Sequence, residues 1–443
     1  MSAPALNASV PALGTARRPR KFTALERTLD SGLRVVVVRK PGVPLVEVRL
    51  RVPFQSARAA HAARAAVLSD SVLTGTVDHD RAGLAAAVQR LGGDLGIGVD
   101  ADRLQVSGNV LATNLRGFLG VVADVLTGAT YPAKEVVAER ERLVERLTIA
   151  RSRAGVVAGE ALAKRMWGDH PYARDLPEPE DVQAVTAAQV RRLHGDLVRP
   201  EGAVLVIAGD VSAARAADLV AKTLDGWAGA AATATRVPPL PSVEPGPLVL
   251  IDRPGSVQSS LRLGASALRR DDERYPALQL ANLIFGGYFS SRWTENIRED
   301  KGYTYGPHSG IDHHALGSTL QLQADVATEV TGPALLETLY ELGRIASLPP
   351  STDEVESARQ YAIGTLALST ATQSGLASTL SSLAGVGLGP DWLAEHPRRL
   401  AKVTRDEIAA AAAEFLAPSR FATVVVGDAE SVRGPLAALT SVV

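Results

Sequence analysis

Apolar and polar positions near the start of the chain follow first a strand period and then a helix period. Residues 33–39 (LRVVVVR) form a β-branched run between turn residues, and residues 46–52 (VEVRLRV) alternate apolar with charged side chains. Both patterns predict strands, and we expect the second to be the antiparallel partner of the first. Leu84, Val88 and Leu91 then recur at helical spacing and are followed by two glycines, which predicts a helix that ends there.

Further along the chain the same patterns predict more elements and a break. Residues 104–108 alternate like a strand, and residues 132–151 form a long charged helical segment. The apolar run 204–208 (VLVIA) predicts a buried strand that ends in a turn. Residues 228–247 are dense in Ala, Thr and Pro, which is typical of a linker between domains.

The part of the chain after this linker repeats the part before it. Three short features recur at one constant offset: Val185-Thr186, Pro200 and Gly209-Asp210 reappear as Val403-Thr404, Pro418 and Gly427-Asp428. We interpret this as a duplicated α+β domain, the alternative being strand and turn chemistry that recurs in Ala-rich sequence. The predicted organisation is a disordered arm over 1–24, an N-terminal α+β domain over 25–228, a linker over 229–247 and a C-terminal α+β domain over 248–443.

Composition narrows the class of protein. The chain has 443 residues, too many for one ordinary core, and a net charge of −1 gives no reason to expect nucleic acid or an anionic membrane as a partner. There is no cysteine, so thiolate catalysis and Cys-ligated metal are excluded. The sequence shows neither a secretory signal pattern nor an apolar run of about 18 residues, so we expect a cytoplasmic protein. Its Ala- and Arg-rich composition suggests a bacterial source.

Several segments resemble one enzyme family when their order and spacing are considered together. The resemblance covers about residues 25–430 and rests on the runs LDSGLRV (29–35), HPY (170–172), DV and VT (181–186), LH and VRP (193–200), VLVIAGDV (204–211) and FGGYFSSR (285–292). These are similar to the pitrilysin/insulinase-type zinc peptidases. The resemblance implies an α+β fold of two homologous domains, each a mixed β-sheet packed with α-helices, together forming one half of a clamshell.

The zinc motif of that family is absent from this chain. Active members carry His-x-x-Glu-His on an early helix, where two histidines bind Zn²⁺ and the glutamate activates water, and a glutamate ligand follows 76 positions after the second histidine. The run LTGT at 73–76 fixes the register, so the motif positions hold Ala66, Val67, Leu68, Ser69 and Asp70, and the later ligand position holds Arg146. Only Glu139 matches a glutamate that supports the site in relatives. We therefore expect no metal and no cofactor in this chain.

The changed positions lead to one structural hypothesis. Asp70 and Arg146 occupy places that converge on one metal ion in active relatives, so they should form an ion pair that holds their helices together without zinc. The alternative is that both side chains are solvated. The remaining histidines have no spacing that restores the motif. His308, His313 and His314 are closest together, and no Glu or Asp completes a known ligand set with them.

The second domain keeps another element of the family. Arg298 and Tyr305 match an Arg-x6-Tyr element which, in paired relatives, acts on substrate bound to the partner's zinc. By the resemblance, Tyr305 would donate to the oxyanion and Arg298 would hold a substrate carbonyl, while Gly286 and Gly287 would contact substrate. We expect Arg298 to close a helix that begins near Phe289 and Tyr305 to lie in the following strand. Alternatively, Arg298 only satisfies the helix dipole and Tyr305 is an ordinary strand residue.

Two functions from different classes follow. The first is a non-catalytic subunit of a heterodimeric zinc metallopeptidase, whose homologous partner carries the intact His-x-x-Glu-His motif and the zinc, and whose peptide substrate pairs with a sheet edge. A homodimer is also open. The alternative is a zinc-free scaffold or peptide-binding protein of the same fold. Retention of Arg298 and Tyr305 beside an erased zinc site favours the first.

Overall fold

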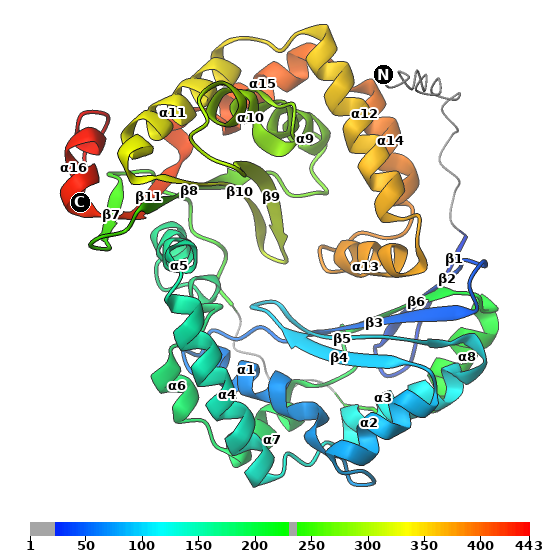
Figure 1. Ribbon diagram of the computed structural model, residues 1–443. Helices are drawn as coiled ribbons and strands as arrows, with labels where there is room; N and C mark the ends of the chain where they lie inside the picture. The colour runs from blue at the N-terminus through cyan, green and yellow to red at the C-terminus, as the bar shows by residue number, and fades with distance from the viewer. Residues whose placement is uncertain (1–22, 230–236) are drawn as a thin grey trace, which may run out of the picture.

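The computed structural model describes residues 23–229 and 237–443 and contains two α+β halves, each organised around one sheet (Figure 1). The strand orders are β1-β2-β6-β3-β5-β4 and β7-β11-β8-β10-β9. The strands of the first sheet are β1 (Ala24–Thr28), β2 (Arg34–Arg39), β3 (Leu45–Pro53), β4 (Asp94–Val99), β5 (Arg103–Leu111) and β6 (Val204–Gly209). Those of the second are β7 (Val249–Asp252), β8 (Gln258–Ala267), β9 (His308–His314), β10 (Gly317–Ala327) and β11 (Ala422–Gly427). The predicted α+β class is confirmed.

Helices surround both sheets. In the first half they are α1 (His61–Ser71), α2 (Arg81–Arg90), α3 (Leu115–Gly128), α4 (Ala133–Arg151), α5 (Ala154–Trp167), α6 (Pro179–Gln183), α7 (Ala187–Leu197) and α8 (Ala213–Thr223). In the second half they are α9 (Tyr275–Asn282), α10 (Arg292–Thr294), α11 (Thr331–Ser347), α12 (Thr352–Ser369), α13 (Gln373–Ala384), α14 (Trp392–Lys402), α15 (Arg405–Phe415) and α16 (Ala429–Ala437). Two π-helical turns, Leu283–Gly287 and Glu295–Asp300, extend α9 and α10.

The predicted pairing of the first two strands is wrong. Strand β6 lies between β2 and β3, parallel to β2 and antiparallel to β3. All six residues of β6 are buried, and a strand without a polar face is stable only at the centre of a sheet that is covered on both sides. The short link between β2 and β3 therefore spans one intervening strand that arrives about 160 residues later in the chain.

The first ordered element begins earlier than predicted. Strand β1 starts at Ala24 and pairs with β2 along its full length, from Ala24 opposite Val38 to Thr28 opposite Arg34. Apart from its last two residues, the predicted arm over 1–24 lies outside the described residues. Part of the predicted linker is fixed in place, because the Pro238 carbonyl oxygen lies 3.0 Å from His170 Nε2.

The two halves have matching topology, as the internal repeat predicted. Strands β6 and β11 are each parallel to one neighbour and antiparallel to the other. Thr186 and Thr404 each form a capping box at the start of a helix, with Gln189 and Glu407 at the third helical position. The repeated sequence features therefore mark equivalent helix starts and central strands.

Each half lends one helix to the other half's sheet (Figure 1). Helix α13 packs on β3 and β6, and helix α5 packs on β8 and β11. The contact under α13 is apolar, and joins Leu376, Leu380 and Leu383 to the outer faces of β2 and β6. The contact under α5 likewise joins Leu162 and Met166 to β11. This exchange buries apolar surface between the halves and makes their folding interdependent.

Helix α13 also covers the charged face of β3. Glu47, Arg49 and Arg51 are all at most 8% exposed. Arg49 donates to Glu47 Oε2 at 2.8 Å and to the Ser374 hydroxyl of α13 at 2.9 Å. Burial, together with the nearby Arg103, lowers the pKa of Arg51 to about 10. The alternating pattern therefore marks a strand whose charged face is paired with polar groups of the other half.

Truncating a leucine of α13 should destabilise the whole chain. Leu376→Ala removes a side chain that is 0% exposed between the two halves, and we expect the free energy of unfolding to fall by about 2–5 kcal/mol in one cooperative step. Leu368→Ala on α12, which is 74% exposed, is the control and should change it by less than about 0.5 kcal/mol. Urea unfolding measures both, and a two-step transition in the Leu376 variant would contradict the interdependence.

A buried histidine should make the second half sensitive to acid. His396 stacks on Trp392 at 4.0 Å, and its Nε2 lies 2.7 Å from Gln279 Oε1. Burial, with added repulsion from Arg399 and Arg270, lowers the pKa of His396 to about 3. Because the folded pKa lies below the unfolded one, its contribution is complete above about pH 6.5 and is lost as the pH falls toward 3.

We therefore expect His396 to account for a loss of about 2 kcal/mol in unfolding free energy between pH 6.5 and pH 5. Urea unfolding of the wild type and of His396→Gln across this range measures it. The variant should lose less stability than the wild type, and identical pH slopes would contradict the assignment to His396.

Candidate functional site

The degenerate zinc positions lie together on two packed helices. Ala66, Ser69 and Asp70 belong to α1, and Arg146 belongs to α4, which packs against α1. Arg146 Nη2 donates to Asp70 Oδ2, so the expected ion pair is present. The side chain of Asp70 is 26% exposed and that of Arg146 is 54% exposed. A guanidinium thus joins the two helices where active relatives have a metal ion.

A second cluster of charges surrounds Glu139, which lies about two turns before Arg146 on α4. The Glu139 side chain is only 7% exposed, and its Oε1 accepts from Arg81 Nη1 and Arg142 Nη1, each at 2.6 Å. Arg81 also reaches Glu135 at 3.1 Å. The hydrogen bonds that Arg81 donates to these two glutamates raise the pKa of Arg81. The buried carboxylate is therefore neutralised by arginines.

The sequence did not lead us to expect Arg81 and Arg142 beside Glu139. Arg142 lies three positions after Glu139 on the same helix, which is a spacing that predicts a contact. Arg81 begins α2, 58 positions away, and nothing in the pattern of the sequence places it beside α4. The structure thus places two further cations, Arg81 and Arg142, beside Glu139, in addition to Arg146, the one cation that alignment with the zinc motif had indicated.

The carboxyl group of Asp70 is electrostatically strained. Burial raises the pKa of Asp70 above its usual value, the bond and charge of Arg146 lower it, and the nearby Glu139 raises it further. The net shift of the Asp70 pKa is upward, so Arg146 offsets only part of the cost of burying this carboxylate. A lone carboxylate already bonded to a guanidinium is a poor metal ligand.

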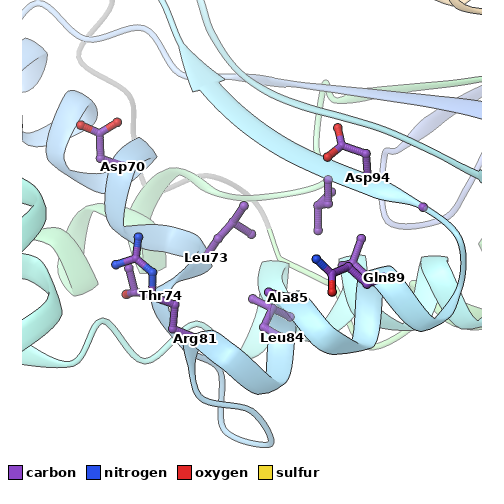
Figure 2. A pocket seen from close by; sticks show the side chains of 11 residues that line it. Asp70, Leu73, Thr74, Arg81, Leu84, Ala85, Gln89 and Asp94 are labelled. Carbon is purple, nitrogen blue, oxygen red and sulfur yellow. The ribbon is translucent and has the colours of Figure 1, made fainter.

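A cavity of about 280 Å³ opens beside this site, between α1, α2 and β4 (Figure 2). Its wall is apolar along one side and carries polar side chains from Asp70, Arg81 and Asp94. Its lining consists of Asp70, Leu73, Thr74, Arg81, Leu84, Ala85, Val88, Gln89, Gly93, Asp94 and Leu95. Above it, the Ser69 hydroxyl lies 3.3 Å from the Ile97 carbonyl oxygen of β4.

Strand β4 offers a free edge next to the degenerate site. It is the last strand of its sheet and pairs only with β5 among the described strands. Gly96 and Gly98 alternate with larger residues along it, and a Cβ added at either glycine would meet no atom within 4 Å. An extended peptide can add to such an edge strand through main-chain hydrogen bonds, and the two glycines leave open space on one face beside it.

The described residues hold no group of three or more His, Cys, Asp or Glu side chains arranged to bind a metal ion. The three clustered histidines have other contacts. His313 Nδ1 lies 2.7 Å from the Ser318 hydroxyl, and His314 lies 4.9 Å from the Tyr172 ring. His308 begins β9.

Arg298 and Tyr305 lie side by side. Arg298 Cζ is 4.8 Å from the centre of the Tyr305 ring, and Tyr305 is 86% exposed. Arg298 lies in the π-helical turn that extends α10, so it is near the end of a helix as predicted. The expected strand at Tyr305 is wrong, because β9 begins only at His308 and Tyr305 lies in the preceding loop.

The turn between these two residues explains how they meet. Gly302 has a φ of 65°, a left-handed conformation that glycine adopts without strain, and Tyr303 N donates to the Ile297 carbonyl at 2.8 Å. Ile297 is fully buried, and the Thr304 hydroxyl donates to the Asp325 carbonyl at 2.7 Å. The chain is thus anchored on both sides of the turn.

Gly286 and Gly287 lie in tight packing. A Cβ on Gly286 would come within 2.8 Å of the Trp293 ring, and one on Gly287 within 3.0 Å of Leu283 Cδ2. Gly286 is buried and directly precedes the segment that carries Phe289. These contacts account for glycine at both positions, and substrate contact by the two residues stays a prediction.

Comparison with known proteins agrees with this geometry. The family described as "Peptidase M16 inactive domain" matches residues 184–361. A Mycobacterium leprae protein described as an uncharacterised zinc protease is 27% identical over 308 residues, covering 67% of this chain and 68% of that protein. A Mycobacterium tuberculosis protein with the same description is 26% identical over 416 residues, covering 92% and 93%.

The structural likeness is closer than the sequence identity. A crystal structure described as the peptidase M16 inactive domain from Pseudomonas fluorescens superposes with a TM-score of 0.83 at 22% identity, covering 92% of this chain and 98% of that one. The sequence matches and the shared fold together support the peptidase M16 family, the pitrilysin/insulinase type, and a non-catalytic member of it. Within the part of the chain that the structure describes, no helix is both long and apolar enough to cross a membrane.

Proposed function

We propose that this chain is the non-catalytic subunit of a heterodimeric zinc metallopeptidase. In this proposal a homologous partner with an intact His-x-x-Glu-His motif holds the zinc, and the two chains enclose a peptide. One observation carries the proposal. The zinc ligands are replaced by a closed ion pair, while Arg298 and Tyr305 are kept together at an accessible position.

The proposed chemistry is a contribution in trans. Tyr305, 86% exposed, can donate its hydroxyl hydrogen to the oxyanion that forms when zinc-activated water attacks the peptide carbonyl. The planar guanidinium of Arg298 offers several donors in a fixed plane and suits a backbone carbonyl of the substrate. Water activation and zinc binding would belong to the partner. This division explains why one site can be lost while the other is retained.

The proposed substrate is an unfolded peptide. The free edge of β4, with its bare glycines, suits pairing with an extended chain, and the cavity beside it suits one apolar side chain. Such pairing would recognise the backbone of the peptide, so the protein would discriminate only weakly among substrate sequences. The chain would thus hold substrate at its own degenerate site and assist cleavage at the partner's zinc.

The first test is capture of tagged chain from its native cells, followed by mass spectrometry of bound proteins. A His-x-x-Glu-His relative in near-equal amount supports the pair. Recovery of this chain alone, or with unrelated proteins only, favours the alternative of a zinc-free scaffold or peptide-binding protein. In that case the roles proposed for Arg298 and Tyr305 are withdrawn.

A further inference from the structure

A second aromatic ring lies against Arg298. Arg298 Cζ is 4.5 Å from the centre of the Phe289 ring and 4.8 Å from that of Tyr305, so one cation contacts two rings. Phe289 is 58% exposed. An exposed Phe289 ring does not contribute to the hydrophobic core. Its contact with Arg298 therefore calls for another explanation.

The segment around Phe289 is rigid although its ring is exposed. The preceding Tyr288 stacks on Tyr361 of α12 at 5.0 Å. Two residues after Phe289, Ser291 N donates to the Tyr288 carbonyl, and Arg292 donates to both carboxylate oxygens of Glu354 at 2.5 and 2.9 Å. The Phe289 backbone is therefore held from both sides, which fixes where its ring can lie.

The two rings limit how the guanidinium can turn. A cation beside an aromatic face gains about 0.5–1 kcal/mol at an exposed site, and contact with two rings opposes rotation away from either. Arg298 Nε lies 3.2 Å from Glu299 Oε1. Among residues 23–229 and 237–443, the salt bridge of Arg298 engages Nε and leaves its two Nη atoms without a carboxylate partner. Those donors are thus oriented and available.

We propose that Phe289 is a positioning residue that, together with the Tyr305 ring, holds the Arg298 guanidinium with its Nη donors presented to the peptide. This inference rests on the proposed function, because it deepens the role of the same site. It assigns to Phe289 a task in orienting a donor and no contact with the reacting atoms. Loss of the ring should therefore act only through Arg298.

The test uses the chain reconstituted with its captured zinc-bearing partner and a set of internally quenched unfolded peptides. Phe289→Leu keeps an apolar side chain and removes the ring face, and we expect kcat/KM to fall about five-fold. Phe289→Tyr keeps the ring and should stay within about two-fold of wild type. Tyr340→Leu on α11, with the same 58% exposure, is the matched control and should change nothing.

A double-mutant comparison separates positioning from direct contact. In an Arg298→Ala background, Phe289→Leu should have no further effect. An equal loss in both backgrounds would overturn the inference, because Phe289 would then act without Arg298. Activity unchanged by Phe289→Leu but lowered by Arg298→Ala would also overturn it and leave the proposed function standing. If Arg298→Ala itself has no effect, the proposed function fails and this inference fails with it.

Discussion

Tyr305→Phe is expected to lower the kcat of the reconstituted pair about 100-fold, and Arg298→Ala is expected to lower its kcat/KM. Removing one preformed donor to an oxyanion costs about two to three orders of magnitude in characterised peptidases. Both side chains are exposed or partly exposed, so neither substitution should unfold the chain. Initial rates with quenched peptides at saturating and at low substrate concentration measure the two effects.

The matched control for the tyrosine is Tyr340→Phe, which removes one exposed hydroxyl from α11 and should leave the rate unchanged. Pair formation must be checked by size-exclusion chromatography, since weaker association would also lower activity. Intact pairs with wild-type rates after both substitutions would show that Arg298 and Tyr305 have no part in cleavage. The scaffold alternative would then be favoured.

Restoring the four lost residues should restore zinc binding. The combined variant Ala66→His, Ser69→Glu, Asp70→His and Arg146→Glu recreates His-x-x-Glu-His and its distant glutamate on helices whose packing the Asp70–Arg146 contact already demonstrates. A structural zinc site contributes about 10 kcal/mol of apparent binding free energy, so we expect one tightly bound zinc per chain. Equilibrium competition with a chromophoric chelator measures the affinity.

The informative control keeps Arg146 and changes only the three positions on α1. A guanidinium at the metal position should repel Zn²⁺ and block one ligand direction, so this variant should bind zinc far more weakly. Equal affinity of the two variants would show that position 146 does not face the metal. Absence of binding by the four-residue variant would contradict the assigned register.

Local features of the sequence predicted local structure well. The charged segment at 132–151 is helix α4, and the glycines after Leu91 end α2. The constant spacing of the repeat identified equivalent helix caps and central strands. The predicted ion pair between Asp70 and Arg146, which was derived from the register of the LTGT run, is present in the structure. These features depend on short segments whose chemistry is visible in the sequence.

Features that depend on distant segments were not predicted. The place of β6 between β2 and β3, and the cover that α13 supplies to Arg49, join residues more than 150 positions apart. Arg81 reaches Glu139 from another helix, 58 positions away in the sequence. A periodic pattern shows that a face is charged or apolar, but it does not identify which element covers that face.

The most direct test of the account is peptidase activity of the isolated chain, of its zinc-bearing partner and of the two mixed. We predict that this chain alone is inactive and binds no zinc, and that the mixture is at least about 100-fold more active than the partner alone. Activity of this chain by itself, or a partner that cleaves equally well without it, would contradict the account.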